Sequence, residues 1–173
     1  MTFFRACLIA LLAAAVAPPA GADRADDSER KSKNGKTEAV IDGITVTLEF
    51  GRPQVRDRKI WGELVPFDKV WRTGADEATT ITFSAPVLIQ GEALDAGIYS
   101  LFTIPGEGKW TVIFNRQADQ WGAYKYDSSQ DALRILVIPR GADHVEAMNF
   151  EIEGSEVSLR WAELALPFAV TAP

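Results

Sequence analysis

The residues best suited to chemistry in this sequence are cations, and they are concentrated in one short segment. From Thr37 onward the chain has twelve Lys and Arg residues against twenty Asp and Glu residues, a net charge of −8. Six of those twelve cations lie between Arg52 and Arg72, where only three acidic residues accompany them. The segment therefore indicates either an anion-binding face on an acidic body or one half of an internal charge complement.

The stretch KVWRTGADEATTITF, residues 69–83, has two interpretations. In the structural one, a loop folds over the end of a sheet and Arg72 bridges Asp76 or Glu77; removing one partner of such a buried pair costs about 3–5 kcal/mol. In the functional one, several guanidinium groups line a pocket for a carboxylate or sulfate, and Asp76 or Glu77 orients one of them. The arginines of that pocket would be Arg52, Arg56, Arg58 and Arg72.

Aromatic residues near these cations provide a second candidate surface. Trp121 and Tyr124 lie in one loop-to-strand stretch, and Trp61 and Trp71 flank the basic segment. Exposed on a β-sheet, Trp71, Trp121 and Tyr124 would suit the C–H faces of sugar rings. The alternative is that these rings cover the core and hydrogen-bond a backbone group through their polar edges.

The N-terminus predicts an exported protein. Arg5 precedes an apolar run from Cys7 to Ala17, and Ala20-Gly21-Ala22 supplies the small residues of a cleavage site, so residues 1–22 are predicted to be a signal peptide. Eleven apolar residues would span only about 16 Å as a helix, too short for a membrane core of roughly 30 Å. Residues 23–36 carry nine charges in fourteen positions and are predicted to be a disordered linker.

The residue types also limit the chemistry. Cleavage would remove the only cysteine, and His144 is the only histidine, so the chain lacks the usual ligands of zinc, and a Ser-His-Asp triad would have to be built on His144. We expect no metal site, no cofactor and no disulfide. Asp76 and Glu77 could serve a hydrolase only with a turn or a distant partner, because adjacent side chains of an extended chain point in opposite directions. Loop oxygen ligands for calcium remain an open alternative at Asn115, Asp119, Asp127 and Asp131.

Apolar residues alternate along most of the chain with a period of two, which predicts an all-β fold. ITVTLEF (44–50) and TTITF (79–83) each place alternate side chains on one face, and turn residues at 105–109 and 153–156 predict hairpins. IYSLFTI (98–104) and LRILVI (133–138) are apolar on both faces, which favours central strands. We expect one domain, residues 37–173, forming a two-sheet antiparallel β-sandwich or jelly roll of about eight or nine strands with at most short helical turns.

Three blocks of this sequence resemble a known family. They are FGRPQVRDRKIWGELVPFDKVWRTGADEATTITF, LDAGIYSLFTIPGEGKWTVIFN and DQWGAYKYD, in that order, and the resemblance spans about residues 50–139. The chain is similar here to the domain-of-unknown-function family 2911, with Phe50 where Tyr is commoner. The resemblance implies a secreted bacterial domain with a β-sandwich fold, and it implies no particular activity.

These patterns favour a non-catalytic binding or interaction module located in the periplasm or outside the cell. Its partner would be a cell-envelope glycan, an anionic small molecule or an envelope protein, bound through the Arg52–Glu77 segment. The acidic body lacks the basic footprint needed for general binding of nucleic acid, and no membrane span remains after signal removal. A hydrolase that uses acids of residues 72–77, and a purely structural periplasmic domain, are the alternatives.

Overall fold

The computed structural model describes residues 24 and 26–173, and within them the fold is built almost entirely from β-strands. The predicted signal peptide, residues 1–22, lies outside the described residues. Among the described residues no helix is long and apolar enough to cross a membrane. In chain order the elements are β1 (Lys33–Ile41), β2 (Ile44–Arg52), β3 (Thr79–Phe83), β4 (Val87–Ile89), β5 (Glu92–Leu94), β6 (Gly97–Ile104), β7 (Trp110–Asn115), the 3-10 helix η1 (Ser128–Gln130), β8 (Asp131–Val137), β9 (Arg140–Glu153) and β10 (Glu156–Thr171).

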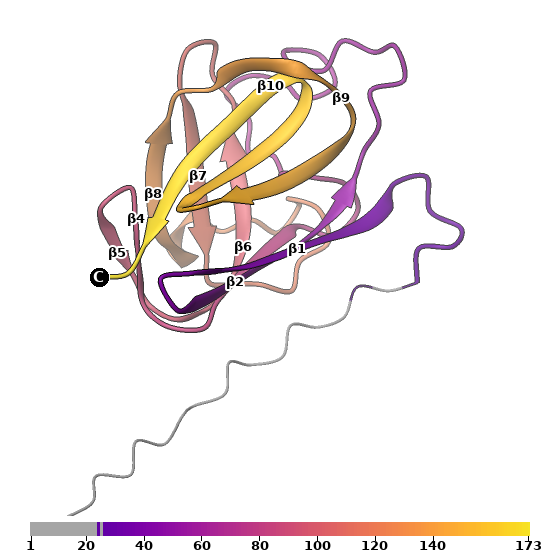
Figure 1. Ribbon diagram of the computed structural model, residues 1–173. Coiled ribbons are helices and arrows are strands. Elements are labelled where there is room, and N and C mark those ends of the chain that lie inside the picture. The colour runs from indigo at the N-terminus through magenta and orange to yellow at the C-terminus, as the bar shows by residue number, and fades with distance from the viewer. Residues whose placement is uncertain (1–23, 25) are drawn as a thin grey trace, which may run out of the picture.

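The ten described strands form two antiparallel sheets, which confirms the predicted β-sandwich. One sheet has the strand order β1-β2-β3-β6-β7-β8, and the other has the order β5-β4-β10-β9. In Figure 1 the long hairpin of β9 and β10 curves in front of β6, β7 and β8. The hydroxyl of Thr37 in β1 donates to the carbonyl of Phe150 in β9 at 2.8 Å, so the two sheets also meet along that side.

The alternating pattern explains which faces the strands bury. Val46, Leu48 and Phe50 of β2 are fully buried, while the residues between them are half-buried. On β3, Thr79, Ile81 and Phe83 face the core, as the sequence predicts. Because successive side chains of a strand point to opposite faces, this alternation fixes which side of the sheet covers the core.

Both predicted hairpins are present. β6 and β7 pair across residues 105–109, with Ile104 opposite Thr111, and β9 and β10 pair with Glu153 opposite Glu156. Residues 156–171 form one long strand, β10, whose pairing with β9 shifts register on both sides of Ala162. Ala162 has a φ of 50°, and a bulge of this kind bends a long strand.

The structure differs from the sequence predictions at two strands. Residues 33–36, expected in the disordered linker, form the start of β1 because their backbone pairs with residues 49–52 of β2. β8 was expected to be central but is an edge strand, with Leu136 67% and the following Ile138 64% exposed. Apolar residues on both faces of a strand favour a central position because both faces of a central strand are usually covered. One face of β8 is exposed instead, so its apolar residues do not place it in the centre.

The β2–β3 loop packs closely on the sheet at Gly51, and a substitution there tests this contact. A Cβ at Gly51 would lie 2.2 Å from the carbonyl oxygen of Ala75, a backbone atom that cannot rotate away. We therefore expect Gly51→Ala to lower the free energy of unfolding by about 1–3 kcal/mol, the usual cost of overpacking. Urea denaturation measures this change. The matched control is Gly141→Ala in β9, which meets no atom within 4 Å; equal stability of the two variants would contradict the close approach.

Candidate functional site

The long loop between β2 and β3, residues 53–78, carries most of the candidate site and is fixed to both sheets. Trp71 exchanges two backbone hydrogen bonds with Thr103 of β6, at 2.8 and 2.9 Å. Near its start, the amide of Val55 donates to the carbonyl of Glu146 in β9 at 2.9 Å. Because the loop is attached to a strand of each sheet, it lies across the end of the sandwich in a defined position.

A cleft of about 440 Å³ lies between this loop and the segment that leads into β1. Its lining contains four cations and one acid, so its charge is opposite to that of the domain as a whole. The lining residues are Lys31, Ser32, Pro53, Gln54, Arg56, Arg58, Leu64, Val65, Trp71, Arg72, Gly74, Ala75, Asp76 and Trp161. Hereafter we call this site the cationic cleft.

Two tryptophans of the cationic cleft belong to a larger aromatic cluster. The rings of Trp71 and Trp161 stack with centroids 5.9 Å apart and an interplanar angle of 20°. Trp61 packs edge-on against both, and also against Trp110 with centroids 4.8 Å apart. The cleft therefore lies over a rigid apolar floor, because each of these rings is held by other rings.

The guanidinium groups are partly held by the loop itself. Arg56 Nε donates to the side-chain oxygen of Gln54 at 2.9 Å, and its Nη2 donates to the carbonyl of Lys31 at 3.4 Å. Arg58 Nε donates to the carbonyl of Val55 at 2.9 Å. Arg72 differs: its Nε is buried and has no hydrogen-bond partner among the described residues. A buried donor without a partner costs about 1–3 kcal/mol, so the position of Arg72 is maintained against this cost by the surrounding loop.

Backbone strain is concentrated around the cationic cleft. Arg56, Asp57, Thr73 and Asp76 all have positive φ, at 49°, 55°, 53° and 62°. Thr73 is the most unusual, because a β-branched residue rarely adopts this conformation. Its carbonyl accepts a 2.7 Å hydrogen bond from the Thr79 hydroxyl, and its own hydroxyl contacts that of Thr103 at 3.3 Å. Surrounding contacts thus hold a strained turn between Arg72 and Asp76, and such strain is typical of functional sites.

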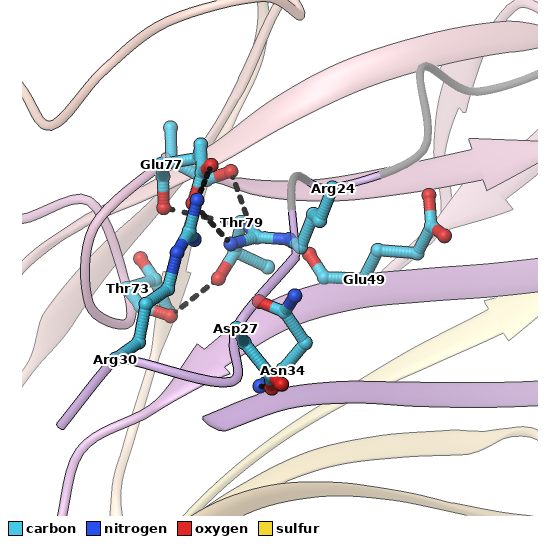
Figure 2. A network of polar contacts seen from close by, with 9 residues as sticks. Arg24, Asp27, Arg30, Asn34, Glu49, Thr73, Glu77 and Thr79 are labelled. Carbon is cyan, nitrogen blue, oxygen red and sulfur yellow. Dashed lines mark hydrogen bonds and ion pairs between the residues drawn. The ribbon is translucent and has the colours of Figure 1, made fainter. Parts of the chain in front are cut away.

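Glu77 lies outside the cleft lining and is held by two arginines of the N-terminal segment (Figure 2). Arg30 donates to both carboxylate oxygens, at 2.5 and 2.7 Å, and Arg24 Nη1 lies 3.3 Å from one of them. Arg24 Nη2 also donates to the carbonyls of Glu49 and Ala78, at 3.0 and 2.8 Å. The guanidinium of Arg30 lies 5.8 Å from the ring centroid of Trp121, within reach of a cation–π contact.

This network shifts the pKa of each member in the direction that its surroundings dictate. The hydrogen bond from Arg30 lowers the pKa of Glu77 below its ordinary 4.5, and the same bond raises the pKa of Arg30. Burial lowers the pKa of Arg24, although Glu77 acts against this. Arg24 loses more hydration than Arg30 because its side chain is only 9% exposed. Glu77 is thus held as a carboxylate.

The structure brings together five of the nine candidate ligand residues in the cationic cleft: Arg56, Arg58, Trp71, Arg72 and Asp76. Arg52 does not line it, and its Nε donates to the carbonyl of Met148 at 3.1 Å. Trp121 and Tyr124, 59% and 88% exposed, lie on the loop between β7 and β8. The β7–β8 loop contacts the β2–β3 loop at Asp76, because the amide of Gly122 donates to the carbonyl of Asp76 at 3.0 Å.

The predicted bridge from Arg72 to Asp76 or Glu77 is wrong: no ion pair or side-chain hydrogen bond links them in the described part of the chain. Glu77 is instead neutralised by Arg24 and Arg30, which lie in the segment predicted to be a disordered linker. Sequence reasoning missed these two residues together with Lys31 and Trp161. A run of charged residues is typical of a solvent-exposed segment. No local sequence pattern predicts that its arginines contact an acid some fifty residues away.

Three of the four oxygen ligands considered for calcium, Asn115, Asp127 and Asp131, have protein partners. The Asp131 carboxylate accepts hydrogen bonds from Asn115, Tyr126 and Arg134, each at 2.7 Å. Burial, with the bond to Asp131, raises the pKa of Tyr126 to about 12. Asp127 caps η1 by accepting from the amide of Ser129 at 2.9 Å. Within residues 24 and 26–173, no group of three or more His, Cys, Asp or Glu side chains is placed to hold a metal ion.

The Glu77 network makes a prediction about pH. A lowered folded-state pKa contributes stability above the unfolded value of about 4.5, and this contribution is lost as pH falls through the folded value. We expect Glu77→Gln to lower the free energy of unfolding by about 1–2 kcal/mol at pH 7, because two guanidinium groups lose a partly exposed partner. The difference from the unaltered chain should shrink below pH 4. Chemical denaturation at several pH values measures it, and a difference that is constant from pH 3 to pH 7 would contradict the network.

Comparison with known proteins identifies a family. A family model described as "Protein of unknown function (DUF2911)" matches residues 32–170. Neither the curated proteins nor the solved structures give a match. The family match covers the whole cationic cleft except Lys31, and it covers most of the chain. This chain therefore belongs to the family DUF2911.

Proposed function

We propose that this protein is an exported, non-catalytic binding module whose cationic cleft holds an anionic group of a cell-envelope ligand. The observation that carries the proposal is the gathering of Lys31, Arg56, Arg58 and Arg72 around one concave site on an otherwise acidic domain. Export rests on the predicted signal peptide, which would deliver the domain to the periplasm or the exterior. A cell-envelope glycan that bears carboxylates is the favoured ligand class.

Charge and shape together support this ligand class. Guanidinium groups recognise carboxylate and sulfate oxygens by directed hydrogen bonds, and three of them, those of Arg56, Arg58 and Arg72, line this cleft. Trp71 and Trp161 are buried, at 9% and 1% exposed, so they support the cleft from below as part of the core and leave little ring face for a sugar. The strained loop would keep Arg72 and Asp76 in place before the ligand arrives, which lowers the ordering cost of binding.

Binding without catalysis is favoured over hydrolysis by the acids themselves. Hydrolysis of a glycoside by the usual mechanism needs two carboxyl groups across the bond, and Asp76 is the one acid among the described residues that line the cleft. Glu77 is held as a carboxylate by Arg24 and Arg30, so it is poorly suited to act as a general acid.

A substitution at Arg72 tests the proposal. Calorimetry and thermal shift would use trigalacturonate and a peptidoglycan fragment, with uncharged maltotriose for comparison. We expect the anionic probes to raise the melting temperature of the unaltered domain, and maltotriose to have no effect. Arg72→Gln should weaken binding at least about tenfold, equivalent to about 1.4 kcal/mol, without unfolding the domain.

The matched control removes a cation elsewhere on the surface. Arg140 is exposed, pairs with Glu156 at 3.2 Å and does not line the cationic cleft. Arg140→Gln makes the same change in net charge and should bind the anionic probes as the unaltered domain does. Equal weakening in both variants would indicate a general charge effect, and no binding of any anionic probe would overturn the proposed function.

A further inference from the structure

We infer that the N-terminal segment, Arg24 and residues 26–32, is a strap that completes the cationic cleft and that Glu77 is the residue that locks it in place. This N-terminal strap lies in the stretch predicted to be a linker and almost wholly precedes the family match, which begins at residue 32. The inference rests on the proposed function, because it assigns the strap a role in that same site.

The first step is the anchoring of the N-terminal strap at Arg24. Its guanidinium is almost fully buried and donates to two backbone carbonyls, one on β2 (Glu49) and one directly before β3 (Ala78). Burying a guanidinium is costly unless its donors are satisfied. A freely mobile linker would leave that guanidinium in water, so these contacts identify a docked segment.

The second step is the turn that carries the strap from Arg30 to the cleft. The amide of Arg30 donates to the carbonyl of Asp27 at 2.9 Å, and Lys33 Nζ donates to the same carbonyl at 2.7 Å. The Asp27 carboxylate accepts from the amide of Asn34 in β1. The turn is thereby tied to the sheet on one side, while Arg30 is tied to Glu77 on the other.

The third step is that the strap supplies part of the cleft wall. Lys31 and Ser32 line the cationic cleft and directly follow Arg30. The carbonyl of Lys31 accepts from Arg56 Nη2 at 3.4 Å, which links the strap to a cation of the loop. Lys31 is thus one of the four cations of the site, and its position depends on the ion pair between Arg30 and Glu77.

The two adjacent acids of the loop therefore have separate tasks. Asp76 lines the cleft, while Glu77 does not and binds the strap. The positive φ of Asp76 sets the direction in which the chain leaves the cleft wall toward Glu77. Glu77 is accordingly a positioning residue, which acts on a bound anion only through Arg30 and Lys31.

Three substitutions in the full mature chain test this inference with trigalacturonate as the probe. Lys31→Gln should weaken binding about threefold, the effect of one exposed charge, and leave the strap docked. Arg30→Gln and Glu77→Gln should weaken binding at least about threefold, and both should also speed hydrogen exchange at the backbone amide of residue 30. Lys36→Gln is the control, since Lys36 is exposed on β1 and pairs with Glu38 at 3.3 Å; its affinity and exchange should match the unaltered chain.

The outcomes separate the strap from the proposed function. If the unaltered chain binds the probe and Arg30→Gln and Glu77→Gln bind equally well, the strap is not part of the site and the inference is wrong. If the unaltered chain binds no anionic probe, the proposed function fails, and the exchange data decide the strap alone: rapid exchange at the Arg30 amide in the unaltered chain would overturn it. Weaker binding by Glu77→Gln alone could result from unfolding of the β2–β3 loop. Arg30→Gln separates the two effects, because it breaks the same ion pair and leaves every residue of that loop unchanged.

Discussion

The backbone pairing of Trp71 with Thr103 is the constraint on which the cationic cleft depends. Two hydrogen bonds at 2.8 and 2.9 Å attach the middle of a long loop to a central strand, and the indole Nε1 of Trp71 donates to the carbonyl of Gly74 at 3.2 Å. The ring itself stacks on Trp161. Because this residue is fixed through its backbone, its polar edge and its ring, Arg72 has little freedom beside it.

A second constraint is the pair of arginine contacts to Glu77, which hold the N-terminal strap against the loop. Glu77 carries one negative charge and receives two guanidinium groups, so the N-terminal strap cannot leave without exposing a paired carboxylate and pulling Arg24 from its carbonyl partners. The cost of separating such charges is largest where water is excluded. The loop and the strap are therefore two walls of one cleft, held by different interactions: backbone pairing and aromatic packing for the loop, and ion pairing for the strap.

The cleft also explains why an acidic protein can present a basic site. The fold brings Lys31, Arg56, Arg58 and Arg72 around one cleft, where Asp76 is the one acid among the described lining residues. Coulombic interactions in partly buried clefts are screened less than those on open surface. The local charge of the cleft therefore differs in sign from the net charge of the domain.

The two sheets could be predicted from the sequence, because alternation with a period of two decides which face of β2 and β3 is buried, and turn residues decide where hairpins close. The cleft arginines Arg56, Arg58 and Arg72 could also be predicted, because an unbalanced run of cations is visible without a structure, and Trp71 and Asp76 lie next to that run. The structure was needed to show that Arg24 and Arg30 neutralise Glu77, that Trp161 reaches the cleft, and that β8 lies at an edge. Those features depend on contacts between residues far apart in the chain, and periodicity and composition carry information only about near neighbours.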